Sequence, residues 1–264
     1  MSERVKTTPS GETQEALDAV GGRALRAAPG RRGRPGGEES RARLLEAAGK
    51  LFARDGFHGV STRALATAAN VNLAAITYHF GGKQALYHEV LRRLVDDTNP
   101  LVEPIIERLS AGVKEADGDE RALGALAAWF IDRLFTGILG AEQVRWQMAL
   151  MLREFHQPSK EFPMLLRERI NPLHDAVAKL VGAAKGQSPK APETLLLTHA
   201  LIGQCMVFGM ARTVVWARLD WEGYTPERVK RIIGTLTPAV LAMLGLPQVE
   251  AQEKAGAKGA GEDR

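Results

Sequence analysis

The sequence has very little cysteine and few aromatic residues. Its 264 residues include one cysteine, Cys205, and aromatic residues make up only 6% of the chain. A single cysteine excludes a disulfide within the chain and any metal site built from several thiolates. Because Cys205 lies in the apolar stretch GQCMVFGM, we expect a buried, unreactive thiol.

Long apolar runs and catalytic motifs are also missing. The sequence has no charge-free apolar run long enough to cross a membrane, and its N-terminus is polar. We therefore expect no membrane partner and a cytoplasmic protein. There is no phosphate-binding loop, dinucleotide fingerprint or nucleophile elbow, and His88 has no second histidine four residues further on. These absences predict a protein that is not an enzyme and that holds no cofactor or metal.

The residues that are present predict an all-α fold. Leucine and alanine are abundant, apolar residues make up 45% of the chain, and no segment alternates clearly enough to predict a strand. The net charge of +4 and the pI near 9.3 suit a polyanionic partner better than a cationic one.

Both ends of the chain have a composition typical of disorder. Residues 1–37 are rich in glycine, proline and charge, and no acidic residue occurs between 19 and 37. We interpret them as a disordered basic arm, and residues 248–264 as a disordered tail. Within the arm, Arg32-Gly33-Arg34-Pro35 resembles the core of an AT-hook, which lies in the minor groove. The alternative is an arm that only improves solubility.

Apolar spacing predicts four helices between residues 38 and 98. The first begins near Ser40 and ends at Asp55-Gly56, and the second runs from Ser61 or Thr62 to about Ala69. After a tight turn at Asn70-Val71, a third helix extends from Asn72 to Phe80, and a fourth from Gly82 to Val95. The expected inward residues of the two short helices are Leu65, Ala68, Val71, Ile76 and Phe80. Two short helices joined by a tight turn predict a helix-turn-helix DNA-binding domain.

Residues 99–247 are expected to form a second helical domain. A break at Asn99-Pro100 separates it from the first, and Thr225-Pro226 is a strong helix start. The expected helices are 101–110, 120–139, 142–156, 161–184, 193–219 and 226–244. The last two are apolar enough to form a four-helix interface in a homodimer.

The end of the third helix carries polar groups that suit a nucleic-acid backbone. Ala74 and Ala75 allow close approach to a groove floor, and Asn72 is able either to pair with adenine or to cap the helix. Thr77, Tyr78 and His79 offer donors to phosphate oxygens. Lys83 lies in the first turn of the fourth helix, where a cation opposes the helix dipole at a cost of about a few tenths of a kcal/mol. A phosphate bound there makes the position of Lys83 favourable instead of unfavourable.

The stretches STRALATAANV, ITYHF and GGKQALY resemble the DNA-binding domain of TetR-family transcriptional regulators. The resemblance covers about 50 residues, in which the helix spacing, the turn and the lysine after the third helix all agree with the family. It implies phosphate contacts from Thr62, Thr77, Tyr78, His79 and Lys83, and base contacts from Leu73, Ala74 and Ala75. The candidate DNA-binding residues are Arg32, Arg34, Thr62, Arg63, Asn72, Leu73, Ala74, Ala75, Thr77, Tyr78, His79 and Lys83. Two residues depart from the family pattern, namely Thr77 in place of tyrosine and Gly82 in place of a capping serine.

The C-terminal half resembles the ligand domain of the CerR-like subgroup in the stretches MLREFHQPSKEF, RINPLHDAVAKLVG and HALIGQCMVFGMAR. The resemblance implies a site for a small organic molecule and a dimer interface. The candidate ligand-binding residues are Trp129, Phe130, Trp146, Met151, Phe155, His156, Gln204 and Phe208. For each of them taken singly, a place in the core or on the surface is the alternative.

The expected function is sequence-specific DNA binding by a homodimeric transcriptional regulator, which lies on the nucleoid when bound. We expect a repressor that a small organic effector releases from a palindromic operator. One alternative is an activator or a regulator that needs no ligand. The other, from a different class, is a helical small-molecule-binding protein that does not bind DNA.

Overall fold

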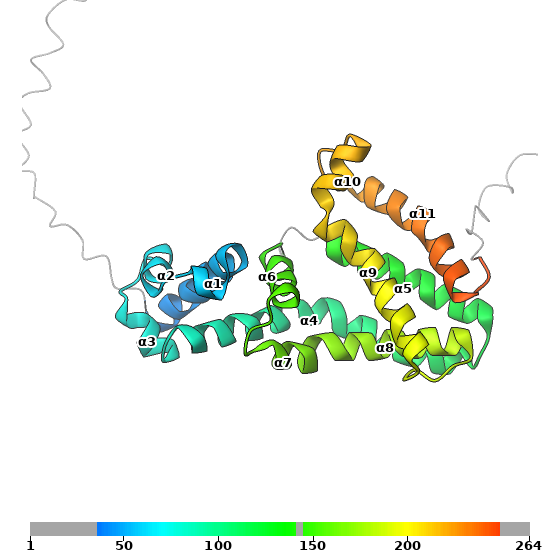
Figure 1. Ribbon diagram of the computed structural model, residues 1–264, viewed down its shortest axis with the longest axis horizontal. Helices are drawn as coiled ribbons and strands as arrows, with labels where there is room; N and C mark the ends of the chain where they lie inside the picture. The colour runs from blue at the N-terminus through cyan, green and yellow to red at the C-terminus, as the bar shows by residue number, and fades with distance from the viewer. Residues whose placement is uncertain (1–35, 141–144, 249–264) are drawn as a thin grey trace, which may run out of the picture. The chain divides into compact units, whose positions relative to one another are not determined.

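The computed structural model describes residues 36–140 and 145–248, and the secondary structure in these ranges is helical without a strand. The expected all-α class is confirmed. The elements are α1 (Gly37–Gly59), α2 (Thr62–Ala68), α3 (Ala74–Phe80), α4 (Lys83–Ala116), α5 (Glu120–Gly140), α6 (Arg145–His156), α7 (Phe162–Leu165), the π-helical turn η2 (Leu166–Ile170), α8 (Asn171–Lys185), α9 (Pro192–Met210), α10 (Arg212–Leu219) and α11 (Pro226–Leu244) (Figure 1). Nearly all of the predicted basic arm and C-terminal tail lies outside the described residues.

Local capping fixes the geometry of α2 and α3. The Ser61 hydroxyl accepts a hydrogen bond from the Ala64 N–H at 3.0 Å, so Ser61 is the cap of α2. Asn70 has a left-handed backbone (φ 51°) at the turn, and the Asn72 side chain accepts from the Ala74 N–H at 2.9 Å. These bonds satisfy helix-terminal amides that short helices otherwise leave unpaired.

Two expectations for the first helices were wrong in detail. Helix α1 begins at Gly37, ahead of Ser40, and continues past a non-helical residue at Gly56 (φ 75°) to Gly59. In α2, Ala68 is exposed, whereas Ala66 and the following Ala69 are buried with Leu65. The inward face is therefore the one that includes positions 65, 66 and 69, spaced as one helical face requires.

The predicted break at Asn99-Pro100 was also wrong. Helix α4 has 34 residues and contains both Pro100 and Pro104. Proline inside a helix costs about 3 kcal/mol, but here Val102, Ile105 and Leu109 bury one face of the helix beyond Pro100. Tertiary packing against α5 and α8 thus outweighs the local penalty.

Later boundaries agree in part with the expectations. The predicted helices 120–139 and 226–244 are confirmed as α5 and α11, and the Thr225 hydroxyl accepts from the Arg228 N–H at 3.3 Å. The predicted helix 161–184 is divided into α7, η2 and α8. The predicted helix 193–219 is divided at Ala211 into α9 and α10. Cys205 is fully buried, and burial raises the pKa of its thiol to about 12, in accord with the unreactive thiol expected above.

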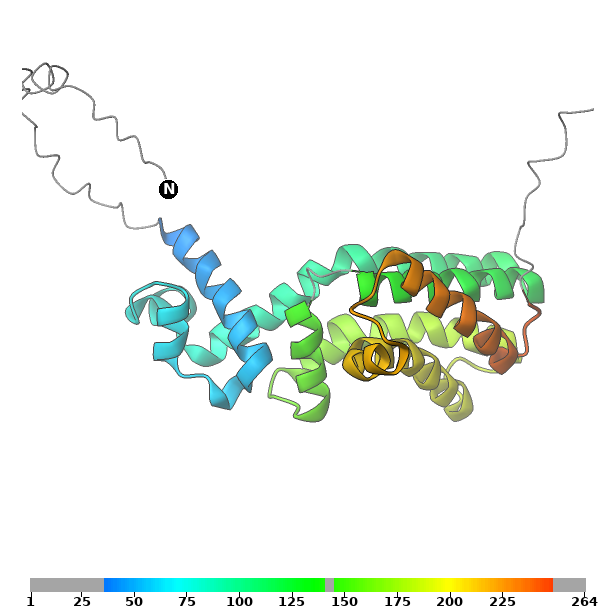
Figure 2. The same cartoon turned by 90° about the horizontal axis from the view of Figure 1, so that it is seen from above.

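Two hydrophobic clusters form the core. The first contains buried residues of α1–α4 from Leu44 to Val95, together with Leu150 of α6 and Met164 and Leu165 of α7. The second begins at Ile105 and includes buried residues of α4, α5, α8, α9 and α11. Figure 2 shows α4 running as one helix from the α1–α3 group to a position alongside α5. The change of core therefore lies within a continuous helix, and α6 and α7 contribute to the N-terminal core.

Helices α5 and α9 are long and apolar enough to cross a membrane by length and composition alone. In α5, much of this apolar surface lies in the core, including Leu123, Phe130 and Phe135. Helix α9 buries Leu201, Ile202 and Cys205, and it leaves Leu195, Leu196, Val207 and Met210 exposed. Burial in the core explains the apolar composition of α5. The apolar outer face of α9, in contrast, stays exposed in the single chain.

The role of α6 in the N-terminal core gives a testable prediction. Leu150 is fully buried in that cluster, whereas Met148 on the same helix is only half-buried, at a cavity wall. Leu150→Ala should lower the free energy of unfolding by about 2–5 kcal/mol because it leaves a cavity. Met148→Ala, the control, should lower it less. Urea denaturation measures both, and equal losses would contradict the assignment of α6 to the first core.

Candidate nucleic-acid interface and internal cavity

Helix α3 presents one apolar face to the core and another to the outside. Ile76 and Phe80 are buried in the first cluster. On the opposite side, Leu73 is 48% exposed and Tyr78 is 83% exposed. Large exposed apolar or aromatic side chains on a short, well-capped helix mark a binding surface.

The other candidate residues of this region differ in accessibility. Thr62, Arg63, Ala74 and Thr77 are exposed, whereas Ala75, His79 and Lys83 are half-buried. Asn72 is exposed, and its side-chain oxygen caps α3, so the capping alternative is the one observed. Tyr78 is 83% exposed, so its ring does not pack on the first helix. Arg32 and Arg34 lie outside the described residues.

Lys83 has an environment that the sequence did not indicate. It is the first residue of α4, and its Nζ lies 4.3 Å from the centroid of the Phe57 ring. Partial burial lowers the pKa of its ammonium group. Among the described residues no carboxylate pairs with Lys83, whereas nearby Arg41 pairs with Glu89 at 2.7 Å. The cation at the start of α4 is thus held by a ring and available to an anion.

The joint between α3 and α4 depends on glycine. Gly81 ends α3 in a left-handed conformation, and Gly82 has φ 142° and ψ −178°. That second conformation is essentially restricted to glycine. Gly82 therefore provides a backbone conformation at this position rather than a side-chain cap, which accounts for the departure from the family pattern.

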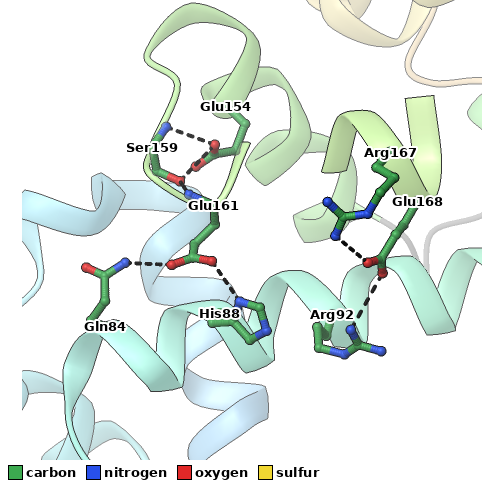
Figure 3. Close-up of polar contacts among 8 residues, drawn as sticks. All are labelled: Gln84, His88, Arg92, Glu154, Ser159, Glu161, Arg167 and Glu168. Carbon is green, nitrogen blue, oxygen red and sulfur yellow. Dashed lines mark hydrogen bonds and ion pairs between the residues drawn. The ribbon is translucent and has the colours of Figure 1, made fainter. Parts of the chain in front are cut away.

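Polar contacts connect the start of α4 with α6 and the segment after it, and Figure 3 shows those of Gln84 and His88 with Glu161 and of Glu154 with Ser159. Glu154 is 1% exposed, accepts a hydrogen bond from the Tyr87 hydroxyl, and also accepts from the Ser159 N–H at 3.1 Å and hydroxyl at 3.0 Å. Burial raises the pKa of Tyr87, and the hydrogen bond to Glu154 adds to this. Glu154 therefore anchors the end of α6 to α4.

A second set of contacts joins α4 to Glu161, which follows α6 in the chain. The Glu161 carboxylate accepts from the Gln84 side-chain amide at 2.9 Å and lies 2.7 Å from His88 Nδ1. The bond to His88 holds the pKa of Glu161 below its usual value. We call Gln84, Tyr87, His88, Glu154, Ser159 and Glu161 the α4 clasp. Sequence reasoning missed the clasp because its partners are 67 to 77 residues apart.

A partly open cavity of about 570 Å³ lies between α4, α5, α6, η2, α8 and α9. Three candidate ligand residues, Trp129, Met151 and Phe155, line it. The other five candidates do not line this cavity. Phe130 is fully buried in the second core, and Phe208 packs against Phe135 with ring centroids 5.5 Å apart.

The remaining three candidates lie elsewhere for clear reasons. Trp146 packs on α1, where Gly49 leaves room for its ring: a Cβ at Gly49 would lie 2.9 Å from it. His156 is exposed at the end of α6, with Nδ1 2.8 Å from the Leu152 carbonyl. Gln204 is exposed beside Met243. Among the described cavity residues, the ones that sequence reasoning missed include Gln147 and Arg169, which no local motif marks.

A capped short helix with a buried inner face and an exposed outer face, braced by α1 and α4, defines a helix-turn-helix DNA-binding domain. Residues 44–90 match the family described as bacterial regulatory proteins, tetR family. Residues 125–245 match the C-terminal domain of the HTH-type transcriptional dual regulator CecR. The chain belongs to the TetR family of DNA-binding transcriptional regulators, with a C-terminal domain of CecR type. The subgroup named CerR-like above is therefore the CecR subgroup.

One relative matches along nearly its whole length, a second matches locally, and a solved structure shares the fold. The dual regulator CecR of Shigella flexneri is 27% identical over 213 residues, which cover 80% of this chain and 95% of CecR. YttP of Bacillus subtilis, named a probable HTH-type transcriptional regulator, is 32% identical over 68 residues, 26% of this chain and 33% of YttP. The structure of AibR with isovaleryl coenzyme A and operator DNA has a TM-score of 0.52 and 15% identity, and the match covers 76% of this chain and 98% of AibR. The likeness to AibR establishes the shared fold.

The position of Lys83 predicts a salt-dependent effect on DNA binding. Lys83→Ala should weaken binding to all DNA sequences and lower the slope of log K against log salt by about 0.9, because one phosphate contact is lost. Lys179→Ala, which removes an exposed lysine of α8, is the control. Fluorescence anisotropy at several salt concentrations measures both slopes. A change in sequence preference with an unchanged slope would show that Lys83 does not contact phosphate.

The α4 clasp predicts a pH dependence of stability. Because the folded-state pKa of Glu161 is lowered, its contribution is present above the unfolded pKa of about 4.3 and is lost as pH falls through the folded pKa. Glu161→Gln should therefore lower the free energy of unfolding at pH 7, with a difference that narrows below about pH 4. Glu115→Gln on the exposed surface of α4 is the control. A pH-independent difference between wild type and Glu161→Gln would refute this role.

Proposed function

We propose that this protein is a homodimeric repressor that binds a palindromic operator through α3 and is released by a small organic effector. In this proposal residues 38–98 form the DNA-binding domain, and residues 99–247 form the ligand-binding and dimerisation domain. The observation that carries the proposal is the exposed outer face of α3, above all Tyr78, on a helix whose inner face is fully packed.

The accessible groups suggest a division of roles at the DNA. Leu73 and Ala74 are positioned for contact with base edges in the major groove. The hydroxyls of Thr62, Thr77 and Tyr78 are suited to phosphate oxygens, as is the Lys83 ammonium. Arg63 adds a further exposed cation at the start of α2. Such a protein acts where the chromosome is, in the cytoplasm.

The apolar outer face of α9 and α10 supports dimerisation. It exposes Leu195, Leu196, Val207 and Met210 on α9, and Val214 at 60% exposure on α10. Exposed apolar patches of this kind favour a protein partner, and a second copy with two-fold symmetry is self-complementary. A two-fold dimer presents two recognition helices about 34–36 Å apart, matching two half-sites of an operator.

Helix α6 is suited to couple the cavity to the DNA-binding helices. Met148, Met151 and Phe155 line the cavity, whereas Leu150 and Glu154 are buried toward α1 and α4. An effector that displaces α6 would act on the α4 clasp and hence on Lys83 and α3. Because linkage is reciprocal, DNA and effector then weaken each other, typically by about 1–3 kcal/mol.

The relatives' names suggest one second candidate. CecR of Shigella flexneri is named a dual regulator, so activation at some promoters is the alternative to repression alone. AibR was solved together with isovaleryl coenzyme A and operator DNA. This supports the proposal that a protein of this fold binds both a small molecule and DNA.

A mobility shift on the DNA upstream of the gene tests the proposal directly. The wild-type protein should give a discrete complex that resists excess non-specific DNA. Tyr78→Phe should lose about tenfold in affinity if the hydroxyl binds phosphate, and Tyr78→Ala should lose at least as much. Because Tyr78 is 83% exposed, neither variant should change the free energy of unfolding by more than about 0.5 kcal/mol.

A reporter fused to the bound promoter separates repression from activation. Deleting the gene should raise expression for a repressor and lower it for an activator. Absence of any DNA complex at low salt would contradict the proposal and favour a helical small-molecule-binding protein.

A further inference from the structure

The internal cavity has a charge imbalance. Its lining includes the cations Arg133 and Arg169 and the imidazole of His174, but no aspartate or glutamate among the described residues. Burial lowers the pKa of His174, and the neighbouring His199 lowers it further, so the imidazole favours its neutral form. The fixed positive charge of the cavity therefore resides on the two arginines.

Arg169 is a half-buried cation that has no counter-ion among the described residues. Its Nη1 is buried and has no hydrogen-bond partner among the described residues. Burial lowers the pKa of its guanidinium to about 10, which still leaves it charged at neutral pH. The adjacent Glu168 does not neutralise it, because Glu168 pairs with Arg167 at 3.0 Å and with Arg92 at 3.6 Å (Figure 3). A cation with a buried, unpaired N–H group is stabilised by a nearby anion, which supplies the missing hydrogen-bond partner.

The local backbone explains how Arg169 comes to line the cavity. It lies in the π-helical turn Leu166–Ile170, directly before α8. A π-helical turn accommodates an extra residue, which changes the direction of the side chains relative to a regular helix, and such turns are frequent at functional sites. Ile170, Leu173 and His174, which follow Arg169, also line the cavity.

A second unpaired polar atom lies on the cavity wall contributed by α6. Gln147 is 5% exposed, and its amide nitrogen donates to Asp97 at 3.2 Å. Its side-chain oxygen is buried without a partner among the described residues. The cavity thus offers an unused acceptor in addition to an unused cationic donor, and buried polar groups are rarely left unpaired.

The rest of the wall is apolar and fits the body of an organic molecule. It includes Leu101 of α4, Trp129 of α5, Met148 and Met151 of α6, and Met206 of α9. The cavity volume of about 570 Å³ is within the range of small-molecule sites. Methionine side chains adapt to ligands of different shape.

We propose that this cavity binds an organic anion with an apolar body, whose anionic group pairs with Arg169. This inference rests on the proposed function, because it names the chemical class of the effector. The planar guanidinium fork matches a carboxylate or a phosphate, and a hydroxyl or amide N–H elsewhere on the ligand donates to Gln147. The pairing supplies the counter-ion that the free cavity lacks.

Arg133 provides a matched control within the same cavity. It also lines the cavity, but it is exposed and pairs with the adjacent Asp132. Removing its charge should therefore change anion selection little. The comparison of Arg169→Gln with Arg133→Gln separates a half-buried cation with an unpaired N–H group from an exposed, paired cation.

Calorimetric titration of the full-length protein with matched acid and amide pairs tests the inference. The probes are octanoate with octanamide and 2-naphthoate with 2-naphthamide, and octyl phosphate distinguishes a phosphate from a carboxylate. In at least one pair the acid should bind the wild type about tenfold or more tightly than the amide. The preference should disappear in Arg169→Gln and persist in Arg133→Gln. Arg169→Lys keeps the charge and should keep part of the preference, which covers a failure of Arg169→Gln to fold.

Three outcomes would overturn the inference: no binding of any anionic probe, equal binding of anion and amide, or an undiminished preference in Arg169→Gln. A parallel operator mobility shift keeps the inference distinct from the proposed function. Anion binding through Arg169 without operator release would support the anion site and refute its role as the effector site. Operator release by a neutral compound, with no anion binding, would support the repressor and refute the anion site.

Discussion

The burial of α4 in two hydrophobic cores is the constraint on which the rest of the structure depends. Its first part, from Leu86 to Val95, packs with α1–α3, and its later part, from Ile105 onward, packs with α5 and α8. Burial on both sides keeps the helix continuous through Pro100 and Pro104. As a result, residues that hold α3 and residues that line the cavity belong to one continuous helix.

Helix α6 also lies between the cavity and the first part of α4. One of its faces lines the cavity, and its end carries Glu154, which is buried against Tyr87. A buried carboxylate without hydrogen-bond partners is costly, so the contact between Glu154 and Tyr87 holds this end of α6 against α4. The α4 clasp therefore joins the cavity wall to the turn that presents Lys83.

Two unpaired cations mark the two binding regions. Lys83 lies over the Phe57 ring near the recognition helix, and Arg169 lines the cavity with a buried, unpaired Nη1. Neither has a carboxylate partner among the described residues, so each is available to an anion from outside the chain. The first suits a DNA phosphate, and the second suits the proposed organic anion. Communication between them then requires a change in the packing of α4 and α6, without any direct interaction of the two anions.

The sequence by itself determined the helical class, the capped helix-turn-helix and the inward positions Ile76 and Phe80 of α3. These follow from local chemistry. The Ser61 and Asn72 side chains accept hydrogen bonds from amides within a few residues, Asn70 has a left-handed backbone at the turn, and Ile76 and Phe80 share one helical face. Only the tertiary structure decided that α4 continues through its prolines, that Tyr87 meets Glu154, and that Arg169 lines the cavity. Those features depend on contacts between residues far apart in the chain or on a π-helical turn. A local sequence pattern cannot reveal them, because the packing and charge involved come from distant residues.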